Sequence, residues 1–230
     1  MEKKKNIINY VITAALFLIF VVFTILVKTV DVQPVGPNDS QVGFASMNSA
    51  FFNLAGSNDK WYNLSEVLGY VAIAVAVCFA VVGFVQALKR KSVKLVDYEI
   101  LLLGGFYVVV VAFYLIFELV DINFRPVLID GELEASYPSS HTMLTLCILS
   151  TARIPLNKLI KHKSLNIVLE ITAIFIMILT IVARMLSGVH WLSDIIGGIL
   201  LSAALIMLYY SAVEHCKSMK DKAAQTSISE

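Results

Sequence analysis

Residues 165–213 read "LNIVLEITAIFIMILTIVARMLSGVHWLSDIIGGILLSAALIMLYYSAV", and this stretch decides the fold. It contains two apolar runs, 165–186 and 192–213, separated by only five residues. Each run is close to the roughly 20 residues that an α-helix needs to cross a bilayer. Because lipid offers no hydrogen-bonding partner to backbone N–H and C=O groups, such a run must be helical. The stretch therefore predicts two membrane helices joined by a short turn.

The rest of the chain repeats this pattern. Apolar runs of similar length occupy 7–27, 66–88 and 98–119, and a shorter one extends over 141–154. The shorter run is either a buried re-entrant segment or, with a few residues added at each end, a helix of nearly spanning length. An apolar content of 58% and a mean hydropathy of +0.80 are too high for a soluble protein of 230 residues. We therefore predict an all-α integral membrane bundle of six helices.

These helices predict one membrane domain over residues 1–230, with residues 98–213 as its core. The first run follows Lys3–Lys5 but is too long for the apolar part of a signal peptide and lacks a convincing cleavage site, so it is predicted to be an anchor. The cysteines are isolated and predict neither a disulfide framework nor a metal cluster. Residues 216–230 are predicted to form a cytoplasmic tail, whose polar end "KDKAAQTSISE" is expected to be disordered.

The basic residues predict the orientation of the chain. With six spans and the N-terminus inside, fourteen lysines and arginines fall on one side of the membrane and four on the other. Basic residues gather on the cytoplasmic side of membrane proteins, so both termini are predicted to be cytoplasmic. The four outer basic residues are Lys28, Lys60, Arg125 and Arg184.

Three segments then lie outside: about 28–65, 120–140 and 187–191. The first opens with the turn-forming residues "QPVGPNDS" and continues with Phe44, Met47, Phe51 and Leu54 at helical spacing. Two structures fit this segment, an interfacial amphipathic helix and an ordered loop packed over the bundle.

Ionisable residues cluster beside the predicted spans, where they are costly and so are functional candidates. On the predicted topology they all lie at the outer face, and they are Arg125, His141, Arg184, His190 and Asp194. Arginine suits a phosphate group, because its planar fork donates hydrogen bonds in pairs and stays charged. The set therefore predicts chemistry on an anion.

Two short motifs refine this hypothesis. In "EASYPSSHTML" (134–144), Ser139 and Ser140 predict a helix start with hydroxyl capping, and the free N–H groups there form an anion site. His141 in the first turn could then donate a proton to a leaving group. His190 and Asp194 are four residues apart, so on a helix they would share a face, and Asp194 would accept a hydrogen bond from one ring nitrogen. The other nitrogen would serve as a nucleophile or a base.

These motifs resemble the three-part signature of the type 2 phosphatidic acid phosphatase family. The matching residues are Arg125-Pro126, then Pro138-Ser139-Ser140-His141, then Ala183-Arg184 with Gly188, His190 and Asp194. The resemblance implies that His190 attacks phosphorus and becomes a phosphohistidine, that Asp194 orients it, and that His141 protonates the leaving oxygen. It also implies that Arg125, Arg184 and the N–H groups near Ser139 and Ser140 bind the phosphoryl group, with no metal or other cofactor.

The chain departs from this signature at three positions. Ser140 replaces a glycine, Ala183 replaces a serine, and Glu118 stands where the family has a lysine, seven residues before Arg125. A carboxylate facing a phosphate would repel it, so Glu118 is expected to rotate away or to pair with an arginine. Lys28 or Lys60 would be the substitutes for the missing cation.

The function expected from this resemblance is hydrolysis of a lipid phosphate at the outer membrane face. Undecaprenyl diphosphate, phosphatidylglycerophosphate and phosphatidate are the candidate substrates, and the expected partners are this lipid and the bilayer, without nucleic acid. A lipid phosphotransferase and a catalytically impaired lipid-phosphate binding protein remain as alternatives.

Overall fold

The structure is a computed structural model that describes residues 2–229. Over these residues the chain forms seven α-helices, two short 3-10 turns and no strand beyond isolated bridges. The α-helices are α1 (Glu2–Thr29), α2 (Ala45–Ala55), α3 (Asp59–Lys89), α4 (Tyr98–Glu118), α5 (Ser140–Leu159), α6 (Lys163–Ser187) and α7 (Leu192–Ser229), and the turns are η1 (Pro37–Asp39) and η2 (Val93–Leu95). The predicted all-α class is confirmed.

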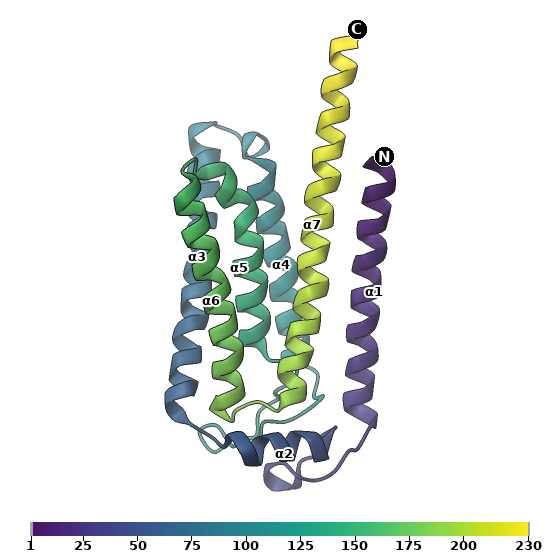
Figure 1. Cartoon of the computed structure of the whole chain (residues 1–230), viewed down its shortest axis with the longest axis vertical. Helices are drawn as coiled ribbons and strands as arrows, with labels where there is room; N and C mark the ends of the chain where they lie inside the picture. Colours follow the sequence, from purple (N-terminus) through teal and green to yellow (C-terminus); the bar gives the residue numbers. More distant parts are fainter. Residues whose placement is uncertain (1, 230) are drawn as a thin grey trace.

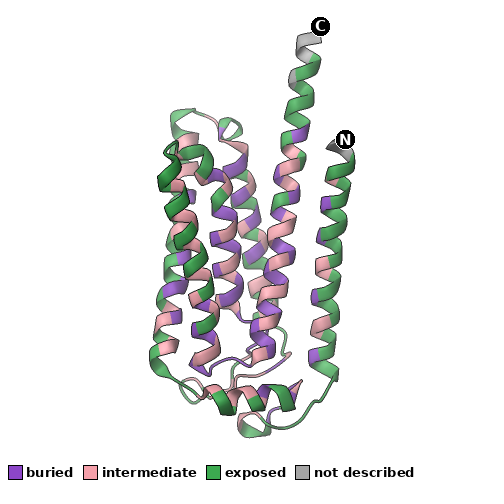
Figure 2. Cartoon of the chain, in the orientation of Figure 1, coloured by how far each residue is buried: buried purple, intermediate pink, exposed green. Residues whose placement is uncertain are grey.

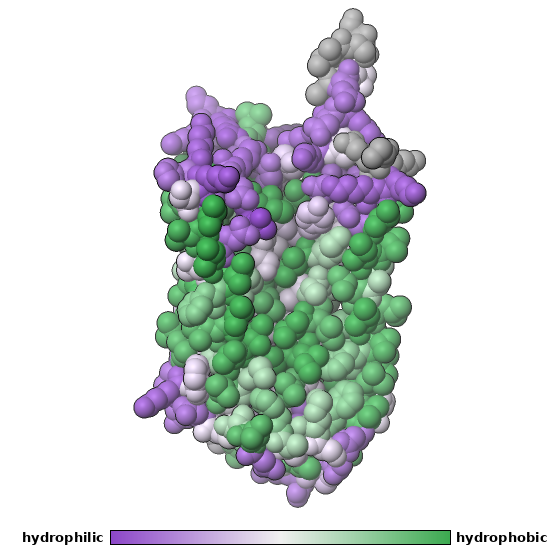
Figure 3. All heavy atoms as spheres, in the orientation of Figure 1, coloured by the Kyte–Doolittle hydropathy of each residue, from purple (hydrophilic) through white to green (hydrophobic). Residues whose placement is uncertain are grey.

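The long helices stand side by side (Figure 1). Many of their large apolar side chains are exposed. Five of the helices in the described part of the chain, α1, α3, α4, α6 and α7, are long and apolar enough to cross a membrane. Figure 3 shows the consequence, an apolar band with hydrophilic side chains gathered at its two ends. Large apolar side chains that point outward, such as Phe84 and Phe175, would be costly in water but not in lipid. The chain is therefore a multi-pass membrane protein.

Helix α5 is the least apolar of the long helices because it lies inside the bundle. It packs against α3, α4, α6 and α7, and many of its residues are buried (Figure 2). Its buried residues include Thr142, Thr145 and Thr151. A helix whose sides face other helices does not need the uniform apolar surface that lipid demands. This position explains why the run over 141–154 is shorter than the others.

Helix α2 lies across one end of the bundle, close to the turn between α6 and α7 (Figure 1). Asn48 is fully buried on its inner side, where its side chain donates to Ser193 Oγ at 2.9 Å and accepts from the Ser193 N–H at 3.0 Å. Met47 and Leu54 are exposed. Of the two alternatives for this segment the helix is the one that forms, and it also packs on the bundle.

The two ends of the chain lie at the opposite end of the bundle from α2 (Figure 1). The prediction of a disordered tail is wrong, because α7 continues without a break to Ser229. Alanine, lysine, glutamine and methionine in this segment favour the helix. Extending an existing helix also avoids the cost of nucleation, which is the main obstacle for a short isolated one.

Candidate active site

The structure brings the ionisable residues of the signature to the α2 end of the bundle. Arg125 lies in the loop between α4 and α5, and His141 is in the first turn of α5. Arg184 lies in the last turn of α6, and Asp194 in the first turn of α7. His190 lies in the turn between α6 and α7. Three segments that are distant in sequence therefore meet at one place, because adjacent helix ends share one face of the bundle.

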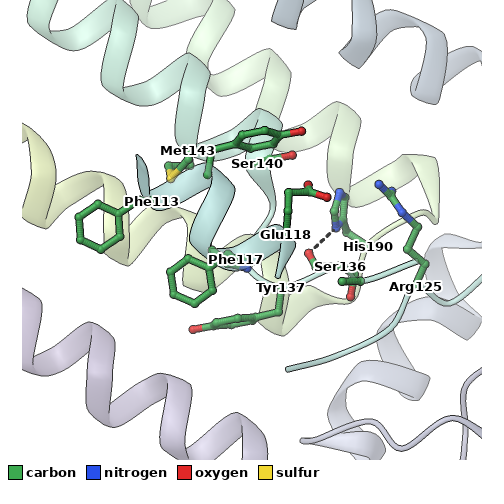
Figure 4. A pocket seen from close by; sticks show the side chains of 12 residues that line it. Phe113, Phe117, Glu118, Arg125, Ser136, Tyr137, Ser140, Met143 and His190 are labelled. Atoms are coloured by element: carbon green, nitrogen blue, oxygen red, sulfur yellow. Dashed lines mark hydrogen bonds between the residues drawn. The ribbon is translucent and has the colours of Figure 1, made fainter. Parts of the chain in front are cut away.

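His190 is buried and held from one side only. Its Nδ1 lies 3.1 Å from the backbone oxygen of Ser136, which can only accept, so Nδ1 carries the proton (Figure 4). Nε2 is buried and has no hydrogen-bond partner among the described residues. Burial, and next the charge of Arg125, hold the pKa of His190 well below its ordinary value of 6.5. The ring is thus neutral, with the lone pair on Nε2.

Asp194 does not accept the hydrogen bond from the His190 ring that the sequence predicts. His190 precedes α7 instead of lying on it, and Asp194 Oδ2 is 3.7 Å from His190 Nδ1, beyond a hydrogen bond. The same oxygen accepts from the Trp191 N–H at 2.9 Å, and Oδ1 accepts from Asn123 Nδ2 at 3.2 Å. Asp194 therefore caps the start of α7 and fixes the turn that carries His190. The carbonyl of Ser136, which holds the ring, had no signal in the sequence because it is a backbone atom.

Helix α5 begins as predicted, with Ser139 as its N-cap residue, but the Ser139 hydroxyl makes no capping bond. It accepts instead from Thr142 Oγ1 at 3.1 Å, and the Ser139 N–H donates to the backbone oxygen of Asp194 at 3.0 Å. The prediction of hydroxyl capping is therefore wrong. Ser140 lines the cavity beside His190, and the first N–H groups of a helix have no intrahelical acceptor. They remain suited to an anion.

Arg184 is the more deeply buried of the two arginines of the site, with only 1% of its side chain exposed. Its Nη2 donates to Glu66 Oε1 at 2.8 Å, and the guanidinium lies 5.7 Å from the centre of the Tyr62 ring. Within the described part of the chain, its Nε and Nη1 are buried without a partner. Buried donors of this kind are rare in proteins and need an explanation. An anion bound beside Arg184 would supply one.

Glu66 is a site residue that the sequence reasoning missed. One of its oxygens, Oε1, lies 3.1 Å from His141 Nε2 as well as 2.8 Å from Arg184 Nη2. A signal was present, since Glu66 is a carboxylate at the start of the apolar run 66–88.

Arg125 is half-buried and is held at two points. Its Nε lies 2.9 Å from Glu134 Oε2, although the geometry is too poor for a hydrogen bond, and its Nη1 donates to the Val189 oxygen at 3.4 Å. It lines the same cavity as His190.

The profile of the PAP2 superfamily matches residues 38–217. The chain belongs to the PAP2 superfamily. The match extends from before α2 into α7 and so includes the whole signature, and the predicted resemblance is confirmed.

The PAP2 fold is also found in a solved structure. The chain is similar to the structure described as "the first transmembrane PAP2 type phosphatidylglycerolphosphate phosphatase from Bacillus subtilis", with a TM-score of 0.61 and 21% sequence identity. The match covers 88% of this chain and 96% of that chain. No curated protein matches the chain significantly in sequence.

The three departures from the PAP2 signature have different structural consequences. Ser140 is an ordinary first residue of α5, so no special backbone conformation calls for glycine there. Ala183 is fully buried at the end of α6, where a serine would place a hydroxyl. Glu118 is the last residue of α4, and it lines the cavity together with Arg125 and His190.

The carboxylate of Glu118 is directed toward His190 (Figure 4). Among the described residues, Glu118 makes no ion pair with Arg125 or Arg184. Arg125 pairs instead with Glu134, and Arg184 pairs with Glu66. The expectation that Glu118 rotates away or pairs with an arginine is therefore wrong. Its side chain ends near the Tyr114 hydroxyl, and it is exposed, so water can solvate its charge.

Lys28 and Lys60, which were expected to substitute for the missing lysine of the signature, do not lie in the cavity. Lys28 Nζ donates to the backbone oxygen of Asp121, and neither Lys28 nor Lys60 lines the cavity or makes an ion pair in the described chain.

Gly188 occupies a position whose backbone conformation and close contacts both require glycine. Its φ of +71° places it in the left-handed region, where it ends α6. A Cβ there would lie 2.6 Å from both the Gly56 oxygen and the Ser57 Cα, so the backbone after α2 leaves no room for one. Gly188 therefore lets the turn before His190 pass close to the segment between α2 and α3.

Taken as chemistry, the site offers a neutral imidazole nitrogen with a free lone pair, a second histidine at a helix start, and two arginines. Within residues 2–229, no group of three histidine, cysteine, aspartate or glutamate side chains is arranged to hold a metal ion. A nucleophile beside unpaired cationic donors is suited to attack on a phosphoryl group.

Proposed function

We propose that this chain is a membrane lipid phosphatase that removes a phosphomonoester or diphosphate head group through a phosphohistidine on His190. Membership of the PAP2 superfamily supports the reaction class. The observation that carries the proposal is the free Nε2 of His190 beside a buried arginine, Arg184, with two unpartnered nitrogens among the described residues.

The proposed reaction has two steps. The Nε2 lone pair of His190 forms a bond to phosphorus while the bond from phosphorus to the leaving oxygen breaks, and His141 gives that oxygen a proton. Water then attacks the phosphohistidine and passes a proton to His141, which restores both histidines. Arg125, Arg184 and the N–H groups at the start of α5 balance the charge that develops on the phosphoryl oxygens. Asp194 keeps the turn of His190 in place, and no metal takes part.

The proposed topology has six spans, with α5 as the sixth, and both termini in the cytoplasm. The fourteen-to-four distribution of basic residues supports this orientation. This orientation would put α2, the start of α5, His141 and His190 at the outer face. Residues 1–230 would then form one domain whose site meets lipid head groups of the outer leaflet.

A groove between α3, α4 and α5 supports a lipid substrate. It has a volume of about 680 Å³ and a mostly apolar lining, and His141 and Glu66 lie at one end of it. An acyl or prenyl chain could remain there while its head group meets the histidines. The candidates remain undecaprenyl diphosphate, phosphatidylglycerophosphate and phosphatidate, the second being the substrate class named for the B. subtilis structure.

A lipid-phosphate binding protein with impaired catalysis is the second candidate, and Glu118 is the observation that favours it. A carboxylate in the cavity opposes an anionic substrate. Both histidines are present, however, and binding alone would need only the arginines. A phosphotransferase would share the first step and pass the phosphoryl group to an acceptor other than water.

The proposal is tested by phosphate release from purified full-length protein in mixed micelles of each candidate lipid, with EDTA present. We expect release of inorganic phosphate from at least one lipid and none from His190→Ala. Lipid binding without any release would support the binding protein, and release only when an alcohol acceptor is added would support the phosphotransferase.

A further inference from the structure

The outer end of α3 surrounds His141 with two features that the reaction scheme leaves unused. Glu66 Oε1 lies 3.1 Å from His141 Nε2 and accepts a hydrogen bond from Arg184 Nη2 at 2.8 Å, so one carboxylate oxygen of α3 contacts both α5 and α6. The side chains of Glu66 and His141 are only 24% and 27% exposed. Water therefore screens this contact less than it would a surface ion pair.

Gly69 lies one helical turn after Glu66, on the same face of α3. A Cβ at this position would lie 2.7 Å from His141 Cδ2 and 3.2 Å from His141 Nε2. The imidazole thus lies against the bare backbone of α3 while Glu66 holds its nitrogen. Both residues, with His141, line the lipid-facing groove.

We infer that Glu66 is the positioning residue of His141, with Gly69 providing the space for the ring, an inference that rests on the proposed function. The contact with Glu66 restricts the orientation of the imidazole about its side-chain torsions. Its charge stabilises the imidazolium, the form that a proton donor needs, within an apolar groove. With Nε2 held by Glu66, Nδ1 is the nitrogen that delivers the proton to the leaving oxygen.

This role differs from that of a purely structural ion pair between α3 and α6. Loss of a structural pair would lower the amount of folded protein and affect all substrates alike. Loss of a positioning residue acts on the step in which His141 transfers a proton. An alkyl phosphate needs that proton because its alcohol is a poor leaving group, whereas p-nitrophenyl phosphate has a leaving group of low pKa and needs it little.

The experiment compares Glu66→Gln with the parent on a lipid phosphate and on p-nitrophenyl phosphate, both with purified full-length protein. Removing a general acid costs roughly 10²–10⁴-fold in rate, so removing its partner should lower kcat for the lipid by about 10-fold or more. The rate with p-nitrophenyl phosphate should fall several-fold less. Glu170→Gln is the matched control, because Glu170 pairs with Arg153 at 3.0 Å and lines neither the site cavity nor the groove.

Two further variants guard against a folding defect in Glu66→Gln. Gly69→Ala displaces the His141 ring without touching Glu66 or Arg184, and it should change the ratio of the two rates in the same direction. Its control is Gly104→Ala, where a Cβ would meet nothing within 4 Å. In the double variant Glu66→Gln/His141→Ala the rates should match those of His141→Ala alone, because the positioning residue has nothing left to position.

The outcomes separate the inference from the proposed function. A parent protein that releases no phosphate from any ester overturns the proposed function and the role of Glu66 with it. An active parent whose Glu66→Gln and Gly69→Ala variants keep the parent's ratio of rates overturns the role of Glu66 alone. Additive losses in the double variant do the same.

Discussion

Replacing Glu118 with lysine should strengthen substrate binding. Glu118 lines the cavity with Arg125 and His190, and it makes no ion pair with an arginine among the described residues. Glu118→Lys changes the local charge by two units without removing such a pair. It also restores the cation that the PAP2 signature has at this position.

The expected size of the effect follows from the exposure of the side chain. Two unit charges about 4 Å apart interact by roughly 1 kcal/mol in water and roughly 4 kcal/mol at an effective dielectric constant of 20. Because Glu118 is exposed, the lower value applies, and a change of two charges gives about 2 kcal/mol. Since about 1.4 kcal/mol corresponds to tenfold in an equilibrium constant, KM should fall by roughly 10- to 30-fold.

The assay is the initial rate of phosphate release at several substrate and salt concentrations. Glu118→Gln, which removes one charge, should show about half of the effect on a logarithmic scale, and both effects should shrink as salt rises. Glu132→Lys makes the same charge change in the α4–α5 loop away from the cavity and should leave KM near the parent value. The reasoning is refuted if Glu118→Lys raises KM, or if both Glu118 variants match the parent.

Three further predictions follow from the same structure. Single cysteines at Asp130 and Ser92, in a background without the native cysteines, should react with an impermeant thiol reagent from opposite sides of the membrane; reaction from one side would contradict the proposed orientation. Gly188→Ala should lower the melting temperature by several degrees. The left-handed conformation costs an L-residue roughly 1–2 kcal/mol, and the new Cβ meets backbone atoms at 2.6 Å. Gly105→Ala, where a Cβ would have open space around it, should leave the melting temperature near the parent value. Burial lowers the pKa of His190, so the proposed nucleophile should stay neutral at mildly acidic pH. The acid limb of the pH profile of kcat/KM, corrected for titration of the substrate, should therefore lie below pH 6.5. An acid limb above that value would mean that His190 is not the neutral nucleophile.

Much of the fold could be predicted because each helix that crosses lipid needs an apolar run of about 20 residues, whatever its neighbours are. The apolar runs correspond to α1, α3, α4, α6 and α7, which are all long and apolar enough to cross a membrane. The weaker signal of α5 has a cause that the sequence cannot display, since its neighbours are other helices. The helical tail was missed because its polar composition is equally typical of disorder, and the continuity with α7 decides the outcome.

The site could be predicted as a set of residues but not as a set of contacts. Arg184 and Glu66 are 118 positions apart, and their pairing depends on which helices are neighbours. The partner of His190 is a backbone carbonyl, to which any residue at position 136 would contribute equally. The spacing of His190 and Asp194 suggested a shared helix, whereas α7 begins two residues after His190.

The central claim is that His190 carries the phosphoryl group, and trapping that intermediate tests it most directly. The purified protein is mixed with labelled substrate and quenched in alkali, which preserves phosphohistidine. Digestion with trypsin then separates His141 from His190, because cleavage sites at Arg153 and Arg184 lie between them. The account predicts one labelled residue, His190, with no label in His190→Ala and retained label in His141→Ala. Label on His141, or label that persists in His190→Ala, would contradict it.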